Sequence, residues 1–156
     1  MKAILGITLA AVSAVGLAGA AYAATATADS SATVVAPITV AKTADLVFGA
    51  FAPTGTAGSV TIANGGARSA TNVDLITSAS GAASFTVTGQ GAFNYNITVT
   101  DNELTDGANS MVLTTTQSVP SGSGMTIVGV GGSIAVGAAQ PAGDYEGTVT
   151  LTAVYS

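Results

Sequence analysis

The residue types that carry most protein chemistry are scarce in this chain. It has no histidine and no cysteine, and its three cations are Lys2, Lys42 and Arg68. Without those two residue types the chain cannot form a nucleophile–histidine pair, a thiolate metal site or a redox centre. Serine and threonine are abundant, but a serine–lysine pair would have to use Lys42. We therefore expect no enzymatic activity, no catalytic residues and no cofactor.

The densest group of oxygen ligands is Asp101-Asn-Glu-Leu-Thr-Asp106. Three carboxylates and one amide within six positions resemble loops that hold calcium. The segment lacks the spacing and the glycine of an EF-hand loop, so we favour a solvated acidic loop and assign no metal ligand. The sequence leaves calcium binding at this loop open.

The charge balance is acidic. After the first 23 residues the chain carries eight Asp and Glu residues against Lys42 and Arg68, a net charge of −6. Binding of nucleic acid needs clustered Lys and Arg side chains that neutralise phosphates, so we expect no nucleic-acid partner. Arg68 could pair with a neighbouring acid, although at an exposed site such a pair contributes little.

The first 23 residues have the pattern of a secretory signal peptide. Lys2 precedes an apolar run rich in alanine, leucine and valine, and Ala21-Tyr22-Ala23 supplies a small-residue cleavage pattern. The apolar run is borderline in length for a membrane span. We expect a secreted mature chain that begins at Ala24 and contains no transmembrane segment.

Apolar and polar residues alternate through most of the remaining chain, which is typical of strands with one buried face. The clearest case is the C-terminus, where threonines and Val154 separate Val149, Leu151, Ala153 and Tyr155. Turn signals such as Asn64-Gly65-Gly66 recur at spacings of about 8 to 12 residues. The pattern predicts an all-β domain over residues 32–156, a sandwich or barrel of about seven to nine strands.

Two local predictions concern the middle of the chain. Residues 84–88 and 93–100 both alternate, and the short Gly89-Gln90-Gly91 link predicts that they form an antiparallel hairpin. Gly131-Gly132 predicts a turn between strand-like residues 125–130 and 134–136. The expected centre of the core is Phe85, Val87, Phe93, Tyr95, Ile97 and Val99.

Several segments resemble a known family. They are Ala36-Pro-Ile-Thr-Val40, Asp45-Leu-Val-Phe-Gly49, Gly66-Ala-Arg-Ser-Ala70, Ala83-Ser-Phe-Thr-Val-Thr-Gly89 and Ala142-Gly-Asp-Tyr-Glu-Gly-Thr148. Together they look like the bacterial secreted family called domain of unknown function 4402, across nearly all of the mature chain. The name of that family implies no function.

Residues 46–49 and the terminal strand are also similar to spore-coat-U-like and other chaperone–usher pilin subunits. Those subunits end in an alternating strand with a penultimate aromatic residue and a glycine fourteen positions from the end, and here Tyr155 and Gly143 occupy these places. The resemblance implies an immunoglobulin-like, pilin-like sandwich that lacks one strand. A periplasmic chaperone lends that strand, and the N-terminal extension of the next subunit replaces it in a fibre.

The resemblance also implies roles for particular residues. The strand-exchange groove would involve Val149, Leu151, Ala153, Tyr155 and Gly143. Residues 24–31 would be the N-terminal extension, and the donor side chains would be Ala24, Ala26, Ala28 and Val34. A structural or adhesive subunit of the periplasm, cell surface or fimbrium of a Gram-negative bacterium is the function that follows.

The alternative function is a self-complete, secreted binding module, for example for surface glycans, that does not polymerise. Sites for sugars usually place exposed aromatic rings against the ligand. The aromatic residues that the sequence leaves free for that role are Phe51, Phe93 and Tyr145.

Overall fold

The computed structural model describes residues 23–156. The predicted signal peptide therefore lies outside the described residues, apart from Ala23. The chain divides into two units, residues 1–33 and residues 34–156. Residues 23–38 belong to no strand, and residues 23–34 are all exposed. Residues 23–156 include no helix with the length and apolar composition needed to cross a membrane.

Residues 34–156 form an all-β, sandwich-like unit, which confirms the predicted fold class. The strands of four or more residues are β1 (Thr39–Ala44), β3 (Gly58–Ile62), β4 (Arg68–Thr71), β6 (Ala83–Thr88), β7 (Asn94–Asp101), β10 (Leu113–Gln117), β12 (Met125–Val136) and β13 (Val149–Tyr155). The shorter strands are β2 (Phe51–Pro53), β5 (Val73–Leu75), β8 (Leu104–Thr105), β9 (Ser110–Met111) and β11 (Ser121–Ser123). The described strands number thirteen, more than the predicted seven to nine, because five short strands lie between the longer ones.

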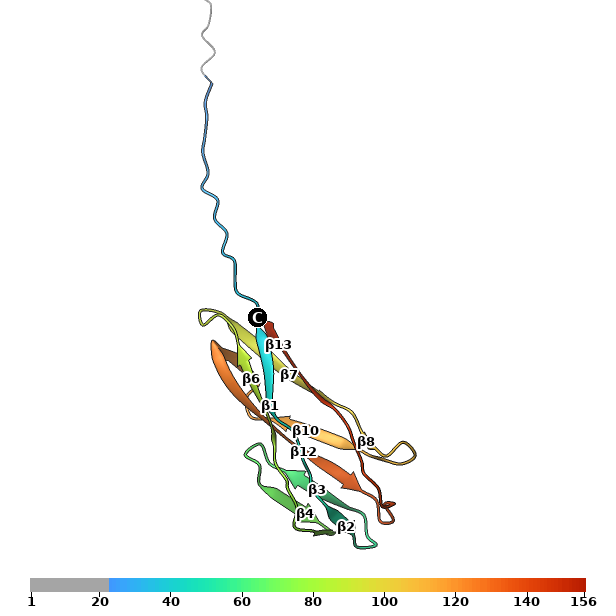
Figure 1. Ribbon diagram of the computed structural model, residues 1–156. Helices are drawn as coiled ribbons and strands as arrows, with labels where there is room; N and C mark the ends of the chain where they lie inside the picture. Colours follow the sequence, from blue (N-terminus) through green and yellow to red (C-terminus); the bar gives the residue numbers. More distant parts are fainter. Residues whose placement is uncertain (1–22) are drawn as a thin grey trace, which may run out of the picture. The chain divides into compact units, whose positions relative to one another are not determined.

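All strand pairs are antiparallel. The larger sheet has the order β1-β6-β12-β3-β4, with β10 also paired to β12, and a three-stranded sheet has the order β11-β7-β13. Two small sheets pair β2 with β5 and β8 with β9. In Figure 1 the end of β13 lies beside the start of β1, so the first and last strands of the unit are neighbours.

The predicted hairpin between residues 84–88 and 93–100 is wrong. β6 pairs with β1 and β12, whereas β7 pairs with β11 and β13 in the other sheet. The connection between them crosses from one sheet to the other, and the Gly89 N–H donates to the Gly124 carbonyl (2.8 Å). Their apolar side chains still meet, because Val87 of β6 and Tyr95 of β7 belong to one buried cluster. The two strands therefore contact each other across the core instead of along a shared edge.

The predicted turn at Gly131-Gly132 is also wrong, because β12 runs through both glycines without a break. A Cβ on Gly131 would lie 2.3 Å from the Ile62 carbonyl oxygen, and one on Gly132 would lie 3.1 Å from the Leu113 Cδ1. Glycine permits this close approach of neighbouring chains in mid-strand. By contrast, the predicted Asn64-Gly65-Gly66 turn is confirmed, since it joins the paired strands β3 and β4.

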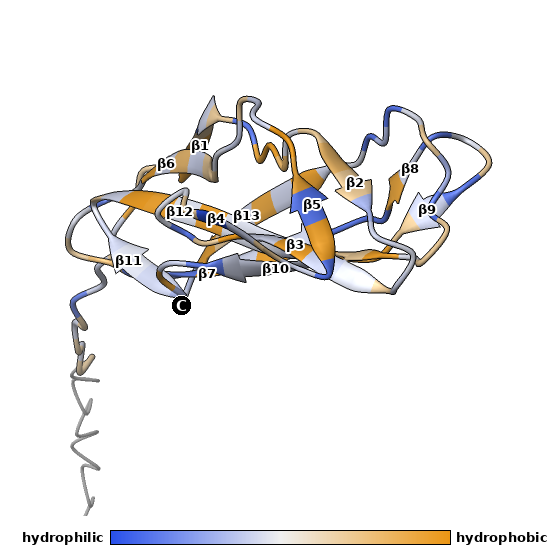
Figure 2. Ribbon diagram, turned by 90° about the horizontal axis from the view of Figure 1, so that it is seen from below, coloured by the Kyte–Doolittle hydropathy of each residue, from blue (hydrophilic) through white to orange (hydrophobic). Residues whose placement is uncertain are grey.

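The buried side chains form two clusters. The first consists of Phe48, Val60, Ile62, Val73, Met111, Leu113, Ile134 and Val136. The second consists of Ala83, Phe85, Val87, Tyr95, Ile97, Val128, Val130 and Leu151. Leu46 and Val149 pack against both clusters. Figure 2 shows the hydrophobic stretches of β12 and β3, which contribute to these clusters, in orange. Four of the six residues expected at the centre of the core are buried, while Phe93 and Val99 are half-buried.

Candidate functional site

The terminal strand and the first strand each have one edge without a strand partner. β13 pairs only with β7 and β1 pairs only with β6. The two strands approach each other, yet no ladder joins them. An edge of this kind presents main-chain N–H and C=O groups to which another extended segment can bind.

An open cleft of about 1180 Å³ lies where β1 and β13 diverge. One wall consists of residues 42 and 44–53, and the other of residues 140–149. Apolar side chains between the walls form the floor: Phe85, Leu104, Met111, Leu113 and Ile134. The cleft therefore combines an apolar floor with two walls that continue from unpaired strand edges, which suits an extended peptide.

Arg68 fixes the first wall. Its guanidinium donates Nη2–H to the Ala50 carbonyl (2.6 Å) and Nη1–H to the Ile76 carbonyl (3.1 Å). The Ser78 hydroxyl accepts the Ala50 N–H (2.7 Å) and donates to the same Ile76 carbonyl (3.2 Å). Gly49 in this wall has φ of +72°, and a Cβ there would lie 2.6 Å from the Ser78 Oγ. Arg68 thus does not form the ion pair that the sequence left open, because its partners are carbonyl groups.

Replacing Arg68 with methionine should destabilise the unit by about 1 to 2 kcal/mol, because two carbonyls lose a charged donor. Thermal unfolding followed by far-UV circular dichroism measures the change. Lys42→Met is the matched control, since it removes only an exposed ion pair with Asp45, and such pairs contribute at most about 1 kcal/mol. Equal losses in the two variants would contradict a special role for Arg68.

The second wall is held by hydrogen bonds within the chain. The Tyr145 hydroxyl donates to the Pro141 carbonyl (2.9 Å) and accepts from the Gln140 amide (2.9 Å). Thr105 and Glu146 exchange two main-chain hydrogen bonds of 2.8 and 3.0 Å. These contacts fix both ends of residues 140–146. The wall therefore keeps its position, although no strand pairs with it on the side that faces the cleft.

The acidic loop next to this wall has a structural role. The Asp106 carboxylate accepts hydrogen bonds from Ala108 N–H (2.9 Å), Asn109 N–H (2.7 Å) and the Asn109 side-chain amide (3.0 Å). These bonds, with the Asn109 side chain contributing most, hold the pKa of Asp106 below its usual value. Asp101 instead accepts the Thr115 N–H (2.7 Å). Within residues 23–156 no group of three potential ligands is placed to hold a metal ion.

The predicted groove residues divide into two sets. Val149 and Gly143 line the cleft, and a Cβ on Gly143 would lie 3.0 Å from the Asp106 Oδ2. Leu151 is buried, and Ala153 and Tyr155 pack half-buried against the second core cluster. The donor residues Ala24, Ala26, Ala28 and Val34 are all exposed and lie in no strand.

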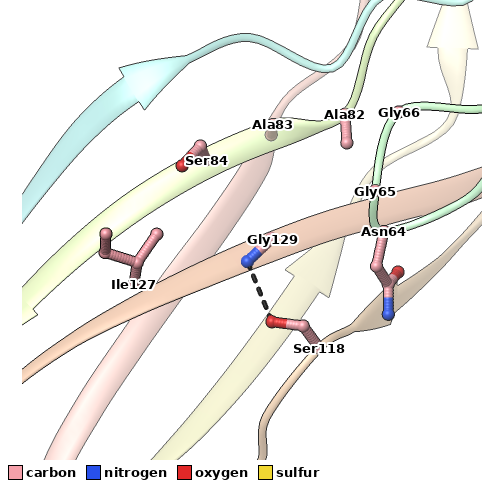
Figure 3. A pocket seen from close by; sticks show the side chains of 9 residues that line it. All are labelled: Asn64, Gly65, Gly66, Ala82, Ala83, Ser84, Ser118, Ile127 and Gly129. Atoms are coloured by element: carbon pink, nitrogen blue, oxygen red, sulfur yellow. Dashed lines mark hydrogen bonds between the residues drawn. The ribbon is translucent and has the colours of Figure 1, made fainter.

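A second pocket, of about 370 Å³, lies beside the β3–β4 turn (Figure 3). Small uncharged residues and Ile127 line it, and the Ser118 hydroxyl accepts the Gly129 N–H (2.9 Å). The pocket contains no charged or aromatic side chain. Of the three aromatic residues considered for sugars, Phe51 and Tyr145 pack against the first core cluster. Phe93 contacts the ring of Tyr155 edge-on (6.2 Å between centroids).

Comparison with known proteins identifies the family. Residues 38–155 match the family described as Domain of unknown function (DUF4402). The chain belongs to this family. The match spans every described strand of this DUF4402 chain, from β1 to β13, and begins after the exposed residues 23–34. No curated protein and no solved structure matched the chain.

Proposed function

We propose that this DUF4402 protein is a secreted structural or adhesive subunit that assembles by exchanging β-strands. The observation that carries the proposal is the open cleft with an apolar floor, which lies beside β1 and β13, each of which has one unpaired edge. A strand inserted there would form main-chain hydrogen bonds with an edge and bury alternate side chains against the floor, as in β-augmentation.

The proposed donor is the N-terminal extension of a second copy. Residues 23–34 are exposed and lie in no strand, so they are available to pair with another molecule. Ala24, Ala26 and Ala28 alternate with threonines and present small side chains to one face. A shallow site suits them, because the floor residues Met111 and Leu113 are only 2% and 7% exposed and already fill the core below.

The location of the protein is part of the same proposal. The leader pattern supports secretion, and the similarity to chaperone–usher pilin subunits supports a periplasmic chaperone and assembly in a fibre. The periplasm, cell surface or fimbrium of a Gram-negative bacterium is the proposed site of action. The absence of histidine and cysteine from the chain supports a structural rather than an enzymatic role.

Disulfide trapping between copies tests the proposal, because the natural chain has no cysteine. Three donor variants each carry one cysteine, at Ala24, Ala26 or Ala28. The acceptor variant carries Val149→Cys in the cleft. The two are mixed in denaturant, refolded together and oxidised. We expect at least one donor position to give a disulfide-linked pair, measured on a non-reducing gel.

The matched control is Thr150→Cys. Thr150 follows Val149 in the sequence, but it lies on the opposite, exposed face of β13. Random collision would link the exposed cysteine at least as well as the one in the cleft. A donor that prefers Val149→Cys supports insertion of the strand. Equal yields, or a preference for Thr150→Cys, would contradict it.

A further inference from the structure

The hydroxyl of Tyr155 connects three segments at the end of the unit where the first and last strands meet. It accepts the Gln90 N–H (2.8 Å) and donates to the Ala36 carbonyl (2.8 Å). The Ala36 N–H in turn donates to the Gln90 Oε1 (3.0 Å). The chain entering β1 is therefore tied to the end of β13 through side chains, although no strand pairing joins the two strands.

The ring of Tyr155 is held so that its hydroxyl reaches these partners. Phe93 and Tyr95 contact it edge-on, with centroids 6.2 and 6.4 Å away. Gly89 leaves room for the ring, since a Cβ at that position would lie 3.1 Å from the Tyr155 hydroxyl. Packing of the ring therefore holds the Tyr155 hydroxyl in place beside Ala36, and the side chain does not rotate freely at the surface.

This contact lies at the opposite end of β13 from the cleft, where the chain approaches the start of β1. Lys42 and Ala44 of β1 and Val149 of β13 line the cleft, whereas the other residues of β13 do not. The cleft therefore ends where β1 and β13 converge toward Tyr155. A strand that enters beside Val149 can extend along the free edge of β13 only if β1 moves away from that edge.

We propose that the Tyr155 hydroxyl is a latch that closes this end of the cleft and slows the entry of a strand. The proposal rests on the proposed strand-exchange function and adds the residue that regulates it. With the latch closed, the start of β1 stays against the end of β13, and only the wide end of the cleft is accessible. Breaking the hydrogen bonds to Gln90 and Ala36 frees the start of β1, so that an incoming strand can pair along the whole of β13.

Tyr155→Phe tests the latch, because it removes the hydroxyl and keeps the ring. The comparison uses the chain without residues 24–31, because these residues belong to no strand of the folded unit and no second copy can then fill the cleft. This protein is compared with its Tyr155→Phe variant and with its Gln90→Ala variant, which removes only the acceptor of the Ala36 N–H. Hydrogen exchange of the protein without peptide measures how fast the Ala36 and Gln90 amide protons exchange with solvent. Stopped-flow fluorescence reports association of a labelled synthetic peptide with the sequence of residues 24–35. Thr152→Val, which removes a hydroxyl from the exposed face of β13, is the control.

We expect Tyr155→Phe to raise the rate of amide exchange at Gln90 and the rate of peptide association by about fivefold to tenfold. This factor corresponds to the loss of one hydrogen bond. Gln90→Ala should act in the same direction at Ala36, and Thr152→Val should change neither. Faster exchange with unchanged peptide association would overturn the latch and leave strand exchange intact. Failure of the peptide to bind any of the proteins would instead overturn the strand-exchange function.

Discussion

Replacing Tyr95 with alanine should lower the free energy of unfolding by about 3 to 5 kcal/mol. Tyr95 has no exposed surface. Its hydroxyl donates to the Gly124 carbonyl (3.2 Å) and shares a second hydrogen bond with the Thr126 hydroxyl (2.8 Å). The side chain thereby links β7 of the three-stranded sheet to the start of β12 in the larger sheet. Domains are stable by about 5 to 15 kcal/mol, so the substitution should remove a large part of the stability.

The matched substitution is Tyr95→Phe, which keeps the ring and its edge-on contact with Tyr155. It should cost about 1 to 3 kcal/mol, because Thr126 and the Gly124 carbonyl lose a buried partner. Urea unfolding followed by far-UV circular dichroism gives both values. If alanine and phenylalanine destabilise the protein equally, the ring does not have the packing role that its burial indicates.

The faces of the strands could be predicted from the sequence, because each side chain's face depends only on its place in the strand. The alternation of Val149, Leu151, Ala153 and Tyr155 correctly places these residues on the inner face of β13. The burial of Phe85, Val87, Tyr95 and Ile97 follows from the same period of two.

The neighbours of each strand could not be predicted in this way. Alternation shows which side of residues 84–88 is buried, but it does not show whether the partner is residues 93–100 or a distant strand. β6 in fact lies between β1 and β12, which are far apart in the sequence. The mid-strand glycines Gly131 and Gly132 resemble a turn for the same reason, since their cause is the close approach of residues that are remote in sequence.

The cleft depends on such remote contacts throughout. Its floor combines side chains from β6, β8, β9, β10 and β12, and no local pattern connects these strands. Arg68 could be noticed as one of two cations after the leader, yet its partners Ala50 and Ile76 are carbonyl groups without a sequence signal. The resemblance of the C-terminus to pilin subunits implied Val149 and Gly143 as groove residues, and both line the cleft.

Deleting residues 24–31 should convert an assembled protein to monomers without lowering its thermal stability. The segment belongs to no strand of its own chain, so its loss removes no ladder hydrogen bond from the folded unit. In the assembly, the same residues would supply the strand that fills the cleft of the next copy. Two substitutions refine the test: Ala26→Asp should weaken assembly strongly, and Thr25→Asp should weaken it less, because alternate side chains face opposite sides.

The molar mass of the mature protein, residues 24–156, measured by light scattering with and without residues 24–31, tests strand exchange most directly. Strand exchange predicts multiples of the single-chain mass for the longer protein and the mass of one chain for the shorter one. Thermal unfolding of the truncated protein should remain cooperative. A single-chain mass for both proteins would contradict the account and show that residues 24–31 do not join one copy to the next.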